Sequence, residues 1–365
     1  MLSRERIKLA LEHKESDRIP IQDSLWDSTI KRWKSEGVPE EVNIGDYFKY
    51  EMKYFYPDIS MQFPQEILDE NDEYIIERNN FGEVIKNHKN ISTTPQVLDN
   101  TIKNKEDWEN HKGRLVINNK RGISLKSNLD FSVVISIEEG LGEFKKYYEH
   151  GKYMIYGVLV GFDLVQRYVG TERLLISVAT EPTWVKEMFL ENAKFIIKVY
   201  EHMESKGYKF DGVFIYDDLG YRNASLISPK HYKNLVFDMD KLICDYFHGK
   251  GLKVLLHSDG NVNELIPFFI EAGIDCLQPL EVKANMDLVS LKRRFGEKMS
   301  FMGGIDTRLY SKKNIKLVEE EIKTKFKIAK RGGGYIYHCD HSIPHNVSLE
   351  QYKRVLDYVH KYGVY

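Results

Sequence analysis

Short apolar runs alternate with longer amphipathic stretches through the C-terminal half of this chain. The runs have the length of buried strands, and helical spacing of apolar residues separates them. Strands that alternate with helices predict βαβ units and a parallel sheet, the arrangement of an α/β fold. The five predicted strands are Gly212–Tyr216, Lys253–Leu256, Asp275–Leu277, Met299–Met302 and Gly333–Tyr337.

Helix start signals support this alternation. Pro182 stands in the first turn of a predicted helix with a long apolar stripe, and Pro229 opens another that runs towards His248. Ser348 and Gln351 form a capping box for a terminal helix. Each of these signals lies where the alternation predicts a helix to begin.

The N-terminal third is less regular. Ser3 is placed to cap a first helix, and Ile19–Gln22 can follow as a short strand. Glu73–Glu77 and Phe81–Ile85 have the pattern of strands in a small antiparallel insertion, which we predict around residues 40–130. We therefore predict one domain over residues 1–365 that carries this insertion.

Composition mainly excludes certain classes of protein. The 365 residues include 42% hydrophobic ones, enough for a large core, and the net charge of −2 gives no global attraction to nucleic acid or an anionic membrane. No apolar run approaches the roughly 18 to 20 residues that span a bilayer. Cys244, Cys276 and Cys339 are far apart and odd in number, which speaks against a disulfide framework. We expect a cytoplasmic protein.

Polar residues follow the predicted strands, and a parallel barrel gathers all strand ends on one face. His257 and Asp259 are two apart in an extended segment, so their side chains can converge on one atom. An imidazole and a carboxylate at that spacing suit a divalent metal such as zinc. In the alternative interpretation His257 is a hydrogen-bonded rim histidine and Asp259 caps the next helix.

A second constellation, Asp340 and His341, follows the last predicted strand. His341 can complete a metal triad with His257 and Asp259, or act as a catalytic proton donor. Asp340 is a candidate catalytic carboxylate, although it can instead satisfy backbone donors in its loop. Cys339 ranks lower as a thiolate ligand, because alternation along the strand end points it away from its neighbours. Two further imidazoles flank this loop, those of His338 and His345.

Paired carboxylates at a strand end, Asp217 and Asp218, are costly unless they meet a cation, a donor network or a proton. Such crowding can raise one pKa into a range useful for catalysis. Neighbouring side chains alternate, so we favour Asp218 as the catalytic carboxylate that faces the pocket. Glu281 is a further candidate metal ligand or a simple loop charge. The predicted substrate-binding residues are Asp217, Gln278, Glu281, Gly304 and Asp306.

Taken together, these segments resemble the uroporphyrinogen decarboxylase superfamily, which contains the heme-pathway decarboxylase and zinc-dependent corrinoid methyltransferases. The resemblance implies a (β/α)8 TIM barrel with an N-terminal helical and antiparallel elaboration. The matching segments are Ser3-Arg4-Glu5-Arg6, Leu9-Ala10-Leu11, His13-Lys14, Asp17-Arg18-Ile19-Pro20, Arg167, Gly170, Glu172, Pro182, His257-Ser258-Asp259-Gly260-Asn261 and Gly303-Gly304-Ile305-Asp306.

The chain departs from both branches of that superfamily. The decarboxylases grip a porphyrinogen with an arginine-rich N-terminal segment, whereas here Ile21–Asp27 contains no arginine and offers Asp23 and Asp27. The methyltransferases hold zinc with a His-x-Cys pair and a later Cys, and those positions fall on His257, Asp259 and His341. An oxygen and nitrogen ligand set is harder than a thiolate one, so thiol activation on zinc is not implied.

We expect an enzyme that moves a methyl group between a small methylated substrate and a corrinoid on a partner protein. A metal at His257, Asp259 and His341 would polarise the leaving atom, and Asp218 or Asp340 would manage the proton. The alternative is a decarboxylase acting on uroporphyrinogen or a smaller acid, and a third interpretation is a non-catalytic barrel. The oligomeric state, a homodimer included, stays open.

Overall fold

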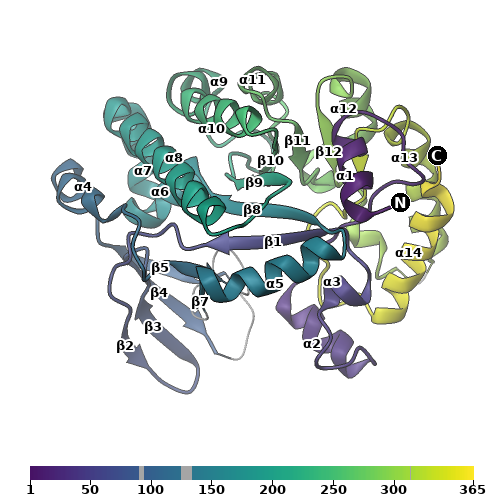
Figure 1. The fold of residues 1–365 in the computed structure, drawn as a ribbon, viewed down its shortest axis with the longest axis horizontal. Coiled ribbons are helices and arrows are strands. Elements are labelled where there is room, and N and C mark those ends of the chain that lie inside the picture. The colour runs from purple at the N-terminus through teal and green to yellow at the C-terminus, as the bar shows by residue number, and fades with distance from the viewer. Residues whose placement is uncertain (90–93, 125–133, 313) are drawn as a thin grey trace.

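The computed structural model describes residues 1–89, 94–124, 134–312 and 314–365. It is an α/β fold built on a curled sheet with the strand order β13-β12-β11-β10-β9-β8-β1-β6-β7 (Figure 1). Neighbouring strands from β1 through β8 to β13 run parallel, while β6 and β7 are antiparallel. The parallel strands are β1 (Met52–Pro57), β8 (Tyr153–Leu159), β9 (Gly212–Tyr216), β10 (Lys253–His257), β11 (Cys276–Gln278), β12 (Ser300–Met302) and β13 (Tyr335–Ile336).

Each of the five strands predicted in the C-terminal half overlaps an observed strand, and the predicted ends lie within two residues of the observed ones. The predicted strand at Ile19–Gln22 was wrong as a regular strand, because Ile21 makes one isolated parallel bridge, to Tyr337. This segment nevertheless bonds both sides of the curled sheet: Gln22 donates to the Tyr337 carbonyl, and Glu51 donates to the Ile21 carbonyl. The sheet therefore meets itself in a ring, consistent with a TIM barrel.

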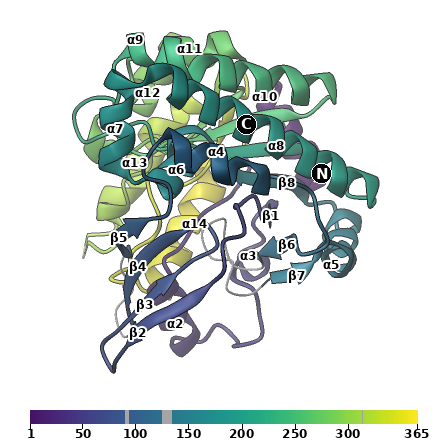
Figure 2. The same cartoon turned by 90° about the vertical axis from the view of Figure 1, so that its left-hand side faces the viewer.

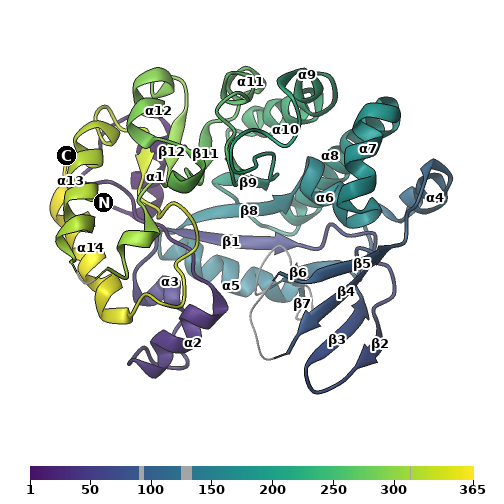
Figure 3. The same ribbon diagram turned by 180° about the vertical axis from the view of Figure 1, so that it is seen from behind.

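Helices cover the outside of the curled sheet. The longest, α8, begins at Pro182 and buries the apolar stripe that the sequence predicts, including Trp184, Met188 and Ile196. Beyond α8 the outer helices alternate with the strands, and α13 and α14 pack against each other (Figure 3). These helices are α5 (Ile137–Glu149), α6 (Gly161–Val169), α7 (Thr171–Thr180), α8 (Pro182–Ser205), α9 (Pro229–His231), α10 (Phe237–Gly249), α11 (Ile266–Ala272), α12 (Leu288–Phe295), α13 (Lys316–Ala329) and α14 (Leu349–Gly363).

The first helix, α1 (Ser3–Leu11), closes the N-terminal end of the curled sheet. Its apolar residues Ile7, Ala10 and Leu11 pack with inward residues of the strands, such as Ile155 and Phe214. Ser3 is the first residue of α1 and Leu2 is its N-cap, so the predicted serine cap was wrong. Burying one helix face inside the strand ring leaves the opposite, C-terminal rim for function.

The N-terminal elaboration is the second sheet, in the order β2-β3-β4-β5, and it is antiparallel. Figure 2 shows it on the side of the molecule opposite α9 and α11. The two strands predicted in the insertion are confirmed as β3 and β4, each shifted by one to three residues. Parts of the predicted insertion, residues 90–93 and 125–130, lie outside the described residues. The elements here are α2 (Asp27–Ser35), α3 (Ile44–Tyr47), β2 (Glu66–Glu70), β3 (Tyr74–Arg78), β4 (Glu83–His88), β5 (Gln96–Asn100), α4 (Lys105–His111), β6 (Gly122–Ser124) and β7 (Val134–Ser136).

Among the described residues, no helix combines the length and the apolar character needed to cross a membrane.

Candidate active site

The C-terminal ends of three adjacent strands define the candidate site. Tyr216 ends β9, His257 ends β10 and Gln278 ends β11, and the three residues stand side by side in register. A register set by parallel pairing places these side chains at one rim of the sheet. The predicted rim residues His257 and Gln278 are therefore neighbours because the strands pair in this register.

The imidazole of His257 is oriented by an amide. Its Nδ1 lies 2.6 Å from Oε1 of Gln278, and a carbonyl oxygen can only accept, so Nδ1 carries the hydrogen. The lone pair of Nε2 then faces Asp218 and Asp259, at 3.6 and 3.9 Å. Burial lowers the pKa of His257, but the charges of Asp259 and Asp218 outweigh it, and the pKa is raised overall. The sequence predicted Gln278 as a substrate contact, whereas here it contacts His257.

Asp259 and Asp218 complete this side of the site. Asp218 accepts a hydrogen bond from the backbone N–H of Asp259 at 2.8 Å, which ties the two loops together. Burial and the charge of Asp163 raise the pKa of Asp218 to about 7. The atom Oδ1 of Asp259 is buried and has no hydrogen-bond partner. A buried carboxylate oxygen without a partner is costly, so the site is suited to an added cation or donor.

Two further carboxylates lie beneath this pair. Asp217 is 1% exposed, and its Oδ1 accepts from the N–H of Asp163 at 3.0 Å. Burial raises its pKa well above the usual range, and the charges of Asp163 and Asp240 add to that shift. Helix α6 approaches Asp217 at Gly161, where a Cβ would stand 2.2 Å from Oδ2. Asp217, predicted to bind substrate, is therefore packed under α6, and Asp163 was missed because no local pattern links it to the strand ends.

His341 lies on the other side of Asp259. Its Nε2 is 3.4 Å from Oδ2 of Asp259, and its ring stacks on Trp26 with centroids 6.0 Å apart. Its Nδ1 accepts a hydrogen bond of 2.7 Å from the N–H of Ser342, so the hydrogen of the neutral ring is on Nε2. The hydrogen bond to Asp259 raises the pKa of His341. His257 and His341 therefore present opposite tautomers to Asp259.

The predicted ligand triad His257, Asp259 and His341 is divided between two overlapping groups. One contains Asp218, His257 and Asp259, the other Asp259, Glu281 and His341, and in each group the ligand atoms lie within 4.8 Å of one another. Asp259 is common to both. Glu281 accepts from the N–H of Gly260 at 2.6 Å and pairs with Lys283 at 2.9 Å. The geometry thus makes Asp259 the centre of the predicted metal set.

The two overlapping groups together form the rim cluster, which consists of Asp218, His257, Asp259, Glu281 and His341. Three other predicted site residues hold loops instead of facing this cluster. Asp340 is 2% exposed; its Oδ1 accepts from the N–H and hydroxyl of Thr307 at 2.9 Å, and its Oδ2 accepts from the N–H of Val282 at 3.2 Å. Asp306 pairs with Arg308 at 2.7 Å, and the Gly304 carbonyl accepts from Lys325. These contacts favour the structural alternative for Asp340 over a catalytic one.

A second buried cluster adjoins the site. Asp23, His338 and Cys339 bring their ligand atoms within 4.8 Å of one another. His338 contacts Gln278 at 3.4 Å and Ser24 at 3.2 Å, so it supports the amide that orients His257. The sulfur of Cys339 lies 3.8 Å from Nδ1 of His338, so the prediction that Cys339 points away from its neighbours was wrong. His345 is exposed and contacts the Ser28 carbonyl, outside the rim cluster.

Aromatic side chains pack near His257. The Tyr216 ring lies 5.1 Å from the His257 ring, and its hydroxyl is 3.2 Å from that of Tyr56. A cavity of about 240 Å³ extends from Tyr54 and Tyr56 to Ser24. We had not predicted these tyrosines, although Tyr54 and Tyr56 alternate along β1 and so share one face.

Residues 151–362 match the family model of uroporphyrinogen decarboxylase, and the chain belongs to this family. It is similar to the solved structure of a methyltransferase from Methanosarcina mazei, with a TM-score of 0.67 and 14% identity over 99% of each chain. That likeness concerns the fold. A structure of Dispersin B matches with a TM-score of 0.35 and 12% identity, over 63% of this chain and 78% of that one. This similarity is too low to support a conclusion about the present chain. No curated protein matches the sequence.

Proposed function

We propose that this chain moves a methyl group between a small methylated substrate and a corrinoid carried by a partner protein. The observation that carries the proposal is the centre at Asp259, where Nε2 of His257, the carboxylate of Asp218 and an unpartnered carboxylate oxygen of Asp259 come together. Family membership supports an enzyme, and the fold is shared with a protein described as a methyltransferase.

The residues around Asp259 fit a divalent metal. Because Nδ1 of His257 is bonded to Gln278, Nε2 is the ring atom that can bind a metal. The Oδ1 atom of Asp259 has no hydrogen-bond partner. Asp218 is the third donor of that group, and the mixed nitrogen and oxygen set suits zinc. When bound, zinc would act as a Lewis acid on the atom that carries the methyl group.

His341 is better suited to hold a proton than to bind the metal. Ser342 donates to its Nδ1, so the hydrogen is at Nε2, directed at Asp259. A substrate atom that replaces Asp259 as the acceptor would receive a hydrogen bond from the same nitrogen. We therefore propose Asp218, His257 and Asp259 as the metal ligands, with Asp218 in the place that the sequence predicted for His341. His341 is proposed as a catalytic proton donor.

The charge of the rim argues against a porphyrinogen substrate. Asp163, Asp218 and Asp259 lie near His257 and act on one another through their charges. A substrate with many carboxylates would meet repulsion there, and the N-terminal segment supplies Asp23 to the adjoining cluster where the decarboxylases carry arginines. Decarboxylation is therefore the weaker of the two proposals.

The test is methyl exchange followed by absorbance. The zinc-loaded protein is incubated with methylated corrinoid and a thiol, a phenol or an amine as acceptor, and the corrinoid spectrum is recorded. We expect demethylation with at least one acceptor class, its loss in His257→Ala, and its retention in His345→Ala, which removes an exposed imidazole outside the cluster. An unchanged spectrum with all three acceptors, or carbon dioxide release from a carboxylic acid, would count against methyl transfer.

A further inference from the structure

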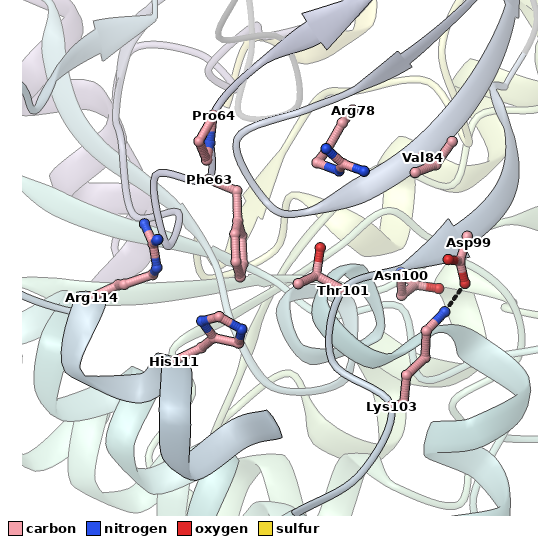
Figure 4. A pocket seen from close by; sticks show the side chains of 10 residues that line it. All are labelled: Phe63, Pro64, Arg78, Val84, Asp99, Asn100, Thr101, Lys103, His111 and Arg114. Carbon is pink, nitrogen blue, oxygen red and sulfur yellow. Dashed lines mark hydrogen bonds and ion pairs between the residues drawn. The ribbon is translucent and has the colours of Figure 1, made fainter. Parts of the chain in front are cut away.

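One cavity lies away from the candidate active site, in the N-terminal elaboration. Its volume is about 380 Å³, within the range of small-molecule sites. Its walls come from the β2–β5 sheet and from the segment around α4 (Figure 4). The family model begins at residue 151, beyond every residue that lines this cavity, so family membership does not account for it.

The lining of this cavity is basic. Arg78, Lys103 and Arg114 contribute cationic groups from three different segments of the chain, and Asp99 is the one carboxylate among the lining residues. Arg78 pairs with Glu66 at 3.0 Å and Lys103 contacts Asp99. The guanidinium of Arg114 donates to the Gln62 carbonyl at 3.3 Å, and the described residues give it no carboxylate partner. The exposed Arg114 is therefore the cationic residue of the lining that has no carboxylate partner among the described residues.

Both Lys103 and Arg114 can add donors for an anion. Burial lowers the pKa of Lys103, the charge of Arg173 lowers it further, and the charge of Asp107 raises it. Arginine presents several N–H groups in a plane that matches carboxylate and phosphate oxygens, so Arg114 is a suitable anchor.

Phe63 forms an aromatic part of the cavity wall. Phe63 lies under the Arg114 guanidinium at 4.9 Å and meets the His111 ring edge-on at 5.1 Å, and Figure 4 shows Phe63 between these two residues and Thr101. A Cβ at Gly82 would stand 2.7 Å from the Phe63 ring and 2.8 Å from Oγ1 of Thr101, and Gly82 has a φ of +88°. The turn before β4 thus requires glycine to support Phe63.

We propose that this cavity binds a small molecule in which a phosphate or carboxylate group is attached to an apolar or planar part. The anionic group would contact Arg114 and Lys103, and the planar part would pack beside Phe63 and Val84. This site shares no residue with the rim cluster around Asp259, so it stands independently of methyl transfer.

The test uses phenyl phosphate and benzoate as probes, with phenol as the uncharged control, and measures their dissociation constants by calorimetry at low ionic strength. Lys103→Gln and Arg114→Gln should each weaken phenyl phosphate about tenfold, the effect of losing one charge-assisted hydrogen bond. Lys89→Gln is the matched control, because Lys89 lies in the same insertion and pairs with Glu70, outside the cavity. It should change the constant less than about twofold.

The pattern across variants decides the result. Stronger binding of phenyl phosphate than of benzoate would identify a phosphate ester as the ligand class, and the reverse order a carboxylate. Equal weakening in Lys89→Gln would mean diffuse charge attraction and would overturn the proposal, as would the absence of saturable binding. Weakening in His257→Ala with no change in Lys103→Gln would place the probe at the rim and would also overturn it. Thermal melting of each variant confirms that it is folded.

Discussion

The two ends of the curled sheet both bury charged side chains, but they balance the charge differently. At the N-terminal end, Glu51 is 1% exposed and contacts Arg6 at 2.9 Å and Arg18 at 2.6 Å. At the C-terminal rim, the carboxylates around His257 outnumber the imidazoles that face them, whereas two guanidiniums face Glu51. The paired end is built for stability, whereas the acidic rim needs a cation or a proton from outside.

Replacing Glu51, the centre of the ion pairs at the N-terminal end of the sheet, should give the largest loss of stability. Glu51→Ala leaves the buried guanidinium of Arg6 without its inner partner, and we expect a loss of about 3 to 5 kcal/mol in the free energy of unfolding. Denaturant unfolding measures this loss. Glu143→Ala, which removes a partly exposed carboxylate paired with Lys53, is the matched control and should cost less than about 1 kcal/mol. Equal losses in both variants would remove the distinction between the two ends.

At the rim, Gln278 should control metal affinity more than stability. Gln278→Leu removes the acceptor of the His257 Nδ1 hydrogen, so Nε2 is no longer fixed as the lone-pair atom. We expect zinc affinity to fall about 10- to 100-fold. Competition with a chromophoric chelator gives the constant. Gln278→Glu keeps an acceptor and should retain most of the affinity, and unchanged affinity in Gln278→Leu would show that the amide does not position the ligand.

Asp340 differs from the carboxylates around His257, because both of its oxygens accept hydrogen bonds. Asp340→Asn replaces one of its accepting oxygens by a donor and should cost about 2 kcal/mol in the free energy of unfolding. Asp306→Asn is the control, and we expect it to cost less free energy of unfolding, because the partner Arg308 is largely exposed. A stable Asp340→Asn variant without methyl transfer would instead restore the catalytic role that the sequence predicted for Asp340.

The smallest expected effect is the pH dependence of the stability that Asp17 contributes at the N-terminal end of the sheet. The hydrogen bond with Arg6 lowers the pKa of Asp17 to about 2. A lowered pKa in the folded state stabilises above the unfolded value and is lost as the pH falls through the folded one. Asp17 is 47% exposed, so after allowance for screening we expect Asp17→Asn to cost about 1 kcal/mol at pH 7. The deficit should close between about pH 4 and pH 2 in urea titrations, and a deficit that persists at pH 2 would contradict the ion pair.

The regular elements could be predicted because their signals are local. The apolar runs before Asp217, His257 and Gln278 are strands since burial on both faces requires such runs, and the helices begin at Pro182 and at the Ser348 capping box. The approach of His257 to Asp259 follows from their spacing. Their common rim follows from the rule that parallel strands end on one side of the sheet.

Only the tertiary structure decided which carboxylates face the rim and which hold the fold. Asp163 reaches Asp217 across 54 residues, and Asp340 reaches Thr307 across 33, so no local pattern encodes either contact. The tautomer of His257 depends in the same way on Gln278, 21 residues away, whereas that of His341 depends on its chain neighbour Ser342. Hydrogen bonds between distant segments form only after the chain has folded, so the sequence could not show that Thr307 holds Asp340 or that Asp163 lies against Asp217.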